Sequence, residues 1–240
     1  MLPLSVHLVA WPHTRAGLAA ASQLGFGSVE VFALGLWNNH PSDISGWLAE
    51  YGLSLSAVFL DLPADPAAAE AAAARAAADA RTFGARRLVV TASHGDVHAA
   101  VAAAGSAAAR AGVRLCLHPH QGTAVESAAD TDAVLAATDP AEVWVCADTG
   151  HLLAAGDDPA AAIAAWLSRL AAVHVKDIDA AGRIVPVGTG RLDLPATVGA
   201  LRRATAAGAP LEHLTIEVED LEDTEAGLRH SVRAVTAVAA

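Results

Sequence analysis

Cysteine and basic residues are both scarce in this sequence of 240 residues. Two cysteines, Cys116 and Cys146, are too few for a disulfide framework, so the sequence predicts a protein of a reducing compartment. Lys and Arg number 15 against 26 Asp and Glu, which gives a formal net charge of −11, and they form no basic stripe. We therefore expect no nucleic-acid partner, because a phosphate backbone requires a cationic surface.

Long hydrophobic runs are also missing from the sequence. No window reaches the roughly 18 uninterrupted apolar residues of a membrane-spanning helix. The first residues, Met-Leu-Pro-Leu-Ser-Val-His, lack the charged segment and long apolar run of a signal peptide. These absences predict a cytoplasmic protein without a membrane partner.

Aromatic residues make up only 4% of the chain, whereas apolar residues make up 54% and alanine carries much of that excess. Because alanine has the highest helix propensity, we interpret it as a filler of helix faces. A length of 240 residues fits one barrel-sized domain, residues 1–240, better than two small ones.

Short runs rich in β-branched residues alternate with longer segments rich in Ala and Leu from end to end. Strands are expected at Ser5–Ala10, Ser28–Phe32, Ser54–Leu60, Arg87–Thr91, Arg114–His118, Val143–Asp148, Val173–Lys176 and Leu214–Val218. Helices are expected at Thr14–Leu24, Asp43–Tyr51, Pro66–Thr82, Val97–Ala111, Ser127–Thr138, Pro159–Leu170, Leu194–Ala207 and Glu222–Ala237. Eight such pairs predict an α/β fold, the closed (β/α)8 TIM barrel. An open doubly wound sheet would place a glycine-rich turn after its first strand, and that turn here reads Trp11-Pro-His-Thr.

Four of the expected strands end in a histidine or a carboxylate. These residues are His118, Asp148, His174 and Glu217, separated by 30, 26 and 43 residues. A parallel barrel would gather them at the face where its active site lies. Their nitrogen and oxygen donors suit one divalent metal ion, Mn2+, Co2+, Zn2+ or Mg2+, and lack the thiolates of a structural zinc site. The alternative for each residue alone is a hydrogen-bonded polar group on a loop.

The alternation of side chains along a strand places all four residues inside the barrel. In the strand Leu214–Val218 the apolar residues would face the helices, which leaves Thr215 and Glu217 inside. His118, Asp148 and His174 turn inward by the same rule. So do His7, Glu30, Phe32, Cys116, Trp144, Cys146, Lys176 and Glu219. Four inward polar strand ends point to a shared site, since an unpaired buried carboxylate is costly.

Further residues are candidates for catalysis or for substrate binding. His120, His151 and Lys176 are candidates for proton transfer, although the histidines could merely start helices and the lysine could reach the solvent at the barrel mouth. The residues assigned to substrate binding are Trp11, Glu30, Trp37, His94 and Glu219. For Trp11, Trp37 and His94 the alternative is core packing or the surface. The loop Val187-Gly-Thr-Gly190 could offer amides to a substrate oxygen or phosphate, or be an ordinary turn.

These residues together resemble the sugar isomerase/epimerase superfamily with the xylose-isomerase-like barrel. The similar segments are Asp148-Thr-Gly-His151, Val173-His-Val-Lys-Asp177, Pro186-Val-Gly-Thr-Gly190 and Ile216-Glu-Val-Glu-Asp220. The resemblance implies one divalent metal ion, Mn2+ first, held by His118, Asp148, His174 and Glu217. We expect a polyol or keto-sugar substrate, with Glu217 as a ligand that also handles protons.

One position departs from the epimerases of that superfamily. They usually carry a glutamate where His118 stands, and the segment His118-Pro-His-Gln-Gly-Thr-Ala-Val-Glu126 resembles the inosose dehydratase branch instead. That branch implies elimination of water from a keto-cyclitol. The alternatives are isomerisation or epimerisation of a sugar or sugar phosphate, an endonuclease-IV-like phosphodiesterase, and a non-catalytic polyol-binding barrel. A homo-oligomer is left open.

Overall fold

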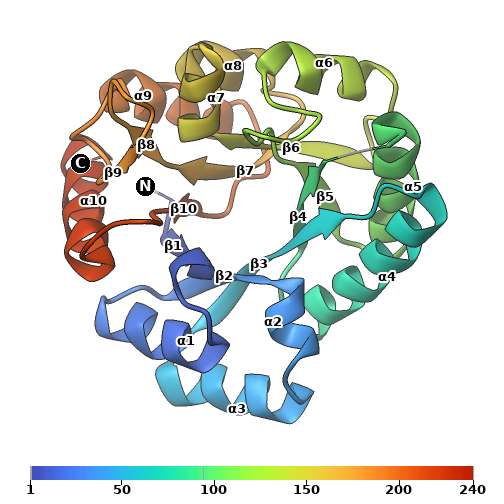
Figure 1. Cartoon of the computed structure of the whole chain (residues 1–240), viewed down its shortest axis with the longest axis horizontal. Coiled ribbons are helices and arrows are strands. Elements are labelled where there is room, and N and C mark those ends of the chain that lie inside the picture. Colours follow the sequence, from blue (N-terminus) through green and yellow to red (C-terminus); the bar gives the residue numbers. More distant parts are fainter. Residues whose placement is uncertain (1, 94, 240) are drawn as a thin grey trace.

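Eight parallel strands close into a barrel in the computed structural model, which describes residues 2–93 and 95–239 (Figure 1). The strands are β1 (Leu4–His7), β2 (Ser28–Phe32), β3 (Ser54–Leu62), β4 (Arg87–Ala92), β5 (Arg114–Leu117), β6 (Val143–Asp148), β7 (Leu170–Val175) and β10 (Leu214–Ile216). They pair in chain order around the barrel, and β10 closes it against β1. The predicted TIM barrel is confirmed.

Helices surround the barrel and follow its strands (Figure 1). The longer ones are α1 (Thr14–Gln23), α3 (Pro41–Tyr51), α4 (Pro66–Thr82), α5 (Val97–Arg110), α6 (Ala128–Ala136), α8 (Pro159–Ala165), α9 (Leu194–Ala206) and α10 (Thr224–Ala239). Several begin at an aspartate or serine that accepts a backbone N–H, such as Asp65, Asp96 and Ser127. No helix within residues 2–93 and 95–239 is long and apolar enough to cross a membrane.

Five short elements were not predicted. They are a 3-10 turn (Leu8–Ala10), α2 (Ala33–Trp37), α7 (Thr149–Ala155) and the hairpin of β8 (Asp177–Ile178) with β9 (Ile184–Val185). The predicted C-terminal end of the helix Pro159–Leu170 was wrong. It stops at Ala165 because the chain turns back at Trp166 and pairs with β6, where the Val145 amide donates to the Arg169 carbonyl.

The apolar core has two layers. The large outer layer lies between the sheet and the helices and includes Val143, Val145 and Ile216. A small cluster fills the barrel interior, namely Ala57, Phe59, Val89, Cys116, Cys146, Ala171 and Ala172. Both cysteines therefore face inward, as the alternation predicts. Beyond this apolar cluster, at the carboxyl ends of the strands, lie the buried polar residues His118, Asp148 and His174.

Candidate metal centre

Four buried side chains converge at the carboxyl ends of neighbouring strands. His118 follows β5, Asp148 ends β6, His174 lies on β7 and Glu217 follows β10. Each offers one ligand atom, and these four atoms lie within 4.8 Å of one another. His118 Nε2 is 3.4 Å from Asp148 Oδ2, and His174 Nδ1 is 2.7 Å from Glu217 Oε2. The structure thus brings together all four residues that the sequence proposes as ligands.

The donor set fits a divalent metal ion. Asp148 Oδ2 and Glu217 Oε2 are buried, yet neither accepts a well-directed hydrogen bond from the part of the chain that the structure describes. Leaving two buried carboxylate oxygens in this state is costly unless a cation lies between them. Two carboxylates with two imidazoles suit Mn2+, Co2+ or Zn2+, and Mg2+ with added water.

Cys146 offers a different grouping with His118 and His174. Its side chain lies in the apolar interior cluster, and burial raises the pKa of the thiol to about 11. A thiol in this state stays protonated at neutral pH, whereas metal binding requires the thiolate. The carboxylate-containing set is therefore the better metal site.

Glu30 orients one of the ligands from below. Its Oε1 lies 2.9 Å from His174 Nε2, and both side chains are buried. The contact is an ion pair and not a well-directed hydrogen bond, but a carboxylate beside Nε2 favours a proton on that nitrogen and so leaves Nδ1 for a metal. The sequence predicts that Glu30 binds substrate, and the structure places its buried carboxylate against His174, a position that suits orientation of this ligand. His7, whose Nδ1 lies 3.5 Å from Glu217 Oε2, also belongs to this layer.

Lys176 is the only lysine of the chain, and its side chain is buried at the edge of the centre with 1% exposure. Its ammonium donates to Glu217 Oε1 at 2.8 Å and to Glu219 Oε1 at 3.0 Å. Burial opposes the charge, but Glu217, Asp148 and Glu219 together hold the pKa of Lys176 above its usual value. The ammonium group therefore does not reach the solvent. It neutralises carboxylates beside the centre.

The segment Asp148-Thr-Gly-His151 builds much of this arrangement. Asp148 Oδ1 accepts the His151 amide and so starts α7, while its other oxygen faces the centre. The Thr149 hydroxyl donates to the Lys176 carbonyl and accepts the Lys176 amide. A Cβ on Gly150 would lie 2.6 Å from Lys176 Cγ, so only glycine leaves room for the lysine stem. His151 Nε2 lies 3.1 Å from Lys176 Nζ.

His120 and His151 lie together above the centre. The centroids of their rings are 3.9 Å apart, and the ring centroid of His151 is 5.6 Å from that of His118. Burial lowers the pKa of His151 to about 3, so its imidazole is neutral at neutral pH. His120 is half-buried and thus nearer the solvent. Of the two histidines proposed for proton transfer, His151 is adjacent to Lys176, whereas His120 is adjacent to His151 and to the ligand His118.

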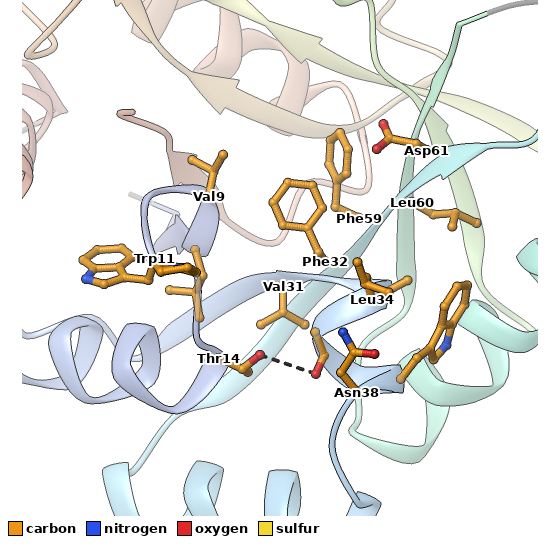
Figure 2. Close-up of a pocket in the computed structure, with 15 residues that line it drawn as sticks. Val9, Trp11, Thr14, Val31, Phe32, Leu34, Asn38, Phe59, Leu60 and Asp61 are labelled. Carbon is orange, nitrogen blue, oxygen red and sulfur yellow. Dashed lines mark hydrogen bonds between the residues drawn. The ribbon is translucent and has the colours of Figure 1, made fainter. Parts of the chain in front are cut away.

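A cavity of about 520 Å³ adjoins the centre at the ends of β1, β2 and β3. Trp11 and Trp37 line it. Phe32 and Phe59, which were not predicted to belong to the site, line it as well, and Figure 2 shows them with Trp11. The indole of Trp37 is held by α4, because its N–H donates to Asp79 Oδ2 at 2.9 Å. Trp11 and Trp37 thus belong to the wall of this cavity, whose lining includes none of the four proposed ligands.

The remaining candidates have other positions. Glu219 is 24% exposed and is paired with Lys176, which places it at the edge of the centre. The predicted substrate-binding residue His94 lies outside the described residues. The amides of Gly188 and Gly190 are not free for a substrate, because both donate to the buried Asp177 Oδ2, at 3.0 and 2.9 Å. Of the two alternatives for this glycine loop, these contacts favour the ordinary turn.

Comparisons with known proteins agree with this architecture. The model of a family described as "Xylose isomerase-like TIM barrel" matches residues 18–237. An inosose dehydratase of Clostridium tetani (strain Massachusetts / E88) is 35% identical over 74 residues, which are 31% of this chain and 25% of that protein. An inosose dehydratase of Bacillus cereus (strain AH820) is 38% identical over 74 residues, with the same coverage of 31% and 25%. The matched segment thus spans about a quarter of the length of these relatives.

Solved structures show the same fold at low sequence identity. The probable 3-DHS dehydratase AsbF from Bacillus anthracis superposes with a TM-score of 0.79 and 14% identity, over 98% of this chain and 99% of that chain. A structure of L-ribulose 3-epimerase superposes with a TM-score of 0.80 and 20% identity, over 100% and 95%. Dehydratases and epimerases are therefore both among the proteins that share this barrel.

Proposed function

The chain belongs to the xylose isomerase-like TIM barrel family, and we propose that it is a divalent-metal-dependent enzyme that removes a proton next to the carbonyl of a keto-sugar or keto-cyclitol. Dehydration of the inosose type is our first choice. The observation that carries this proposal is the buried centre of His118, Asp148, His174 and Glu217 with Lys176 at its edge. The partial similarity to inosose dehydratases supports it.

The four residues would hold one divalent ion, with Mn2+ as the first candidate. Such an ion would supply Lewis-acid polarisation of a substrate carbonyl, which makes the neighbouring C–H more acidic. Glu30 keeps His174 in the tautomer whose Nδ1 faces the centre, and Asp148 is fixed at the start of α7. These contacts preorganise the ligands before an ion arrives.

Proton transfer in this proposal runs through the protein's own side chains. Glu217 Oε2 faces the centre and Oε1 accepts from Lys176, so this carboxylate can take a proton from the substrate. Lys176 holds a proton beside it, and His151 Nε2 is 3.1 Å from that ammonium. His120 extends the path toward the solvent. In the elimination of water, the base removes the proton next to the carbonyl, and the acid gives a proton to the departing hydroxyl, which leaves as water.

Deuterium exchange followed by NMR tests this proposal. The protein is loaded with Mg2+, or with Mn2+ that is chelated before the spectrum, and incubated in D2O with scyllo-inosose and a panel of ketoses. Loss of water to give a diketone is the expected result. Deuterium next to the carbonyl without loss of water would move the assignment to isomerisation or epimerisation. No exchange on any compound would contradict the proposal.

Three variants separate the metal site from the proton chemistry. Asp148→Asn should lose both metal binding and exchange, whereas Glu217→Gln should abolish turnover and keep a bound metal. Glu225→Gln changes an exposed glutamate on the outer helix α10 and should keep both properties. If Asp148→Asn bound metal and turned over like the parent protein, the proposed centre would be wrong.

A further inference from the structure

The cavity beside the metal centre is lined mostly by apolar side chains. Its volume of about 520 Å³ lies within the range of small-molecule sites, roughly 300–1,000 Å³. Leu34, on α2 at its wall, is 62% exposed, the one large apolar residue that the described part of the chain leaves open to solvent. Leu34 thus adds an accessible apolar side chain to a concave surface that is already mostly apolar, and such surfaces are typical of ligand sites. Figure 2 shows Leu34 beside Phe32, Val31 and Asn38 in this cavity.

The cavity and the metal centre share a wall. Phe32 and Phe59 line the cavity, and their rings contact each other at 5.1 Å. The ring of Phe59 is 5.6 Å from that of His118, a proposed ligand. Both rings also contact His7, whose Nδ1 faces Glu217. A molecule that reacts at the centre can therefore extend over these two rings into the cavity.

The cavity offers nothing that would hold a phosphate. No Lys, Arg or His is among the described residues that line it, and the one ionisable group there is the carboxylate of Asp61. Lys176 is already paired with Glu217 and Glu219. The Gly188 and Gly190 amides are taken by Asp177. A phosphate would need cations or free amides, which these groups do not supply.

We propose that the cavity binds an apolar substituent of the substrate. The enzyme would then act on a keto-sugar that carries an aromatic or aliphatic group, and not on a sugar phosphate. The substituent would lie over Phe32 and Phe59 against Leu34, while the keto-sugar reaches the metal centre. This inference rests on the proposed function for the identity of the reacting part.

Binding of matched glycosides tests the inference. Methyl and phenyl 3-oxo-β-D-glucopyranoside, with glucose 6-phosphate as the anionic probe, are titrated into the Mg2+-loaded protein by calorimetry. We expect the phenyl compound to bind at least tenfold more tightly than the methyl compound, and glucose 6-phosphate to bind no better than the methyl compound. Leu34→Asp should reduce the phenyl preference to below threefold. Leu2→Asp, at the opposite end of the barrel, is the control and should retain it.

Each outcome separates this inference from the proposed function. Equal affinity for both glycosides, an unchanged preference in Leu34→Asp, or tighter binding of glucose 6-phosphate would overturn the inference, even if exchange of the keto-sugar protons occurs. A phenyl preference that depends on Leu34 would support the inference even if no compound were turned over. In that case only the proposed reaction would be wrong.

Discussion

Gly150→Ala should destabilise the protein and lower its activity together. An ideal Cβ at this position would lie 2.6 Å from Lys176 Cγ, 2.7 Å from Cδ and 2.9 Å from Cβ. Ordinary carbon contacts are about 3.5–4.0 Å, so either the lysine stem or α7 must move. The lysine cannot move freely, because its ammonium is held by Glu217, Glu219 and His151. The methyl group would therefore strain the centre itself.

Two opposing contributions determine how much Gly150→Ala changes the free energy of unfolding. Overpacking of a buried site costs about 1–3 kcal/mol. Alanine in place of glycine inside a helix contributes about 1 kcal/mol in the opposite direction. Gly46→Ala isolates this second contribution, because Gly46 lies within α3 and its added Cβ would meet nothing within 4 Å. The two variants should thus differ by about 1–3 kcal/mol, or roughly 2–12 °C in melting temperature.

Circular dichroism and the deuterium-exchange assay measure the two effects. Gly46→Ala should melt at or above the temperature of the parent protein and exchange substrate protons at the same rate. Gly150→Ala should melt lower than Gly46→Ala and lose on the order of 10²-fold in rate, as expected for a misplaced group of about 1 Å. If the two variants had equal melting temperatures and rates, Gly150 would not be reserved for the lysine stem.

Three further predictions concern the ligands and their surroundings. Glu30→Gln should weaken Mn2+ binding by about 10–100-fold in an EPR titration, because the partner of His174 is altered, and unchanged affinity would contradict a positioning role. Mn2+ at a hundredfold its Kd should stabilise the protein by about 2.7 kcal/mol in thermal unfolding, and Asp148→Asn should remove this gain. The metal-free protein should lose stability as pH falls from about 6.5 toward 3. In this range His151 binds a proton in the unfolded state, where its pKa is about 6.5, but not in the folded state, where its pKa is about 3. His151→Gln should flatten that decline in urea unfolding at several pH values, and an identical decline would exclude His151 as its source.

The barrel and the ligand set could be predicted because both depend on local patterns. Alternation of apolar and polar residues fixes which side chains of a strand face inward, and parallel strands in a barrel end at one face. Thr215 and Glu217, for example, turn inward simply because Leu214 and Ile216 pack against the helices. No long-range information is needed for that step.

The contacts among inward residues could not be predicted in the same way. They depend on the height of each residue along the barrel axis, which is set by strand register. The register shifts between Val29 and Glu30 and again between Val145 and Cys146, and nothing in the sequence marks either shift. Glu30, which contacts His174, lies directly after the first of these shifts. Alternation turns Phe32 inward, but its place in the cavity wall was likewise visible only in three dimensions.

The choice of lysine at position 176 follows from the shape of its surroundings. The chain contains this one lysine, while its other 14 basic residues are arginines. An ammonium offers three donors in a compact group, and three acceptors lie within 3.1 Å of Nζ, on Glu217, Glu219 and His151. A planar guanidinium would need a larger space and a different donor direction. Gly150 leaves room for the aliphatic chain of Lys176 but for no wider side chain, so the two residues depend on each other. Together they fix the ammonium beside Glu217, where the proposed proton transfer requires it.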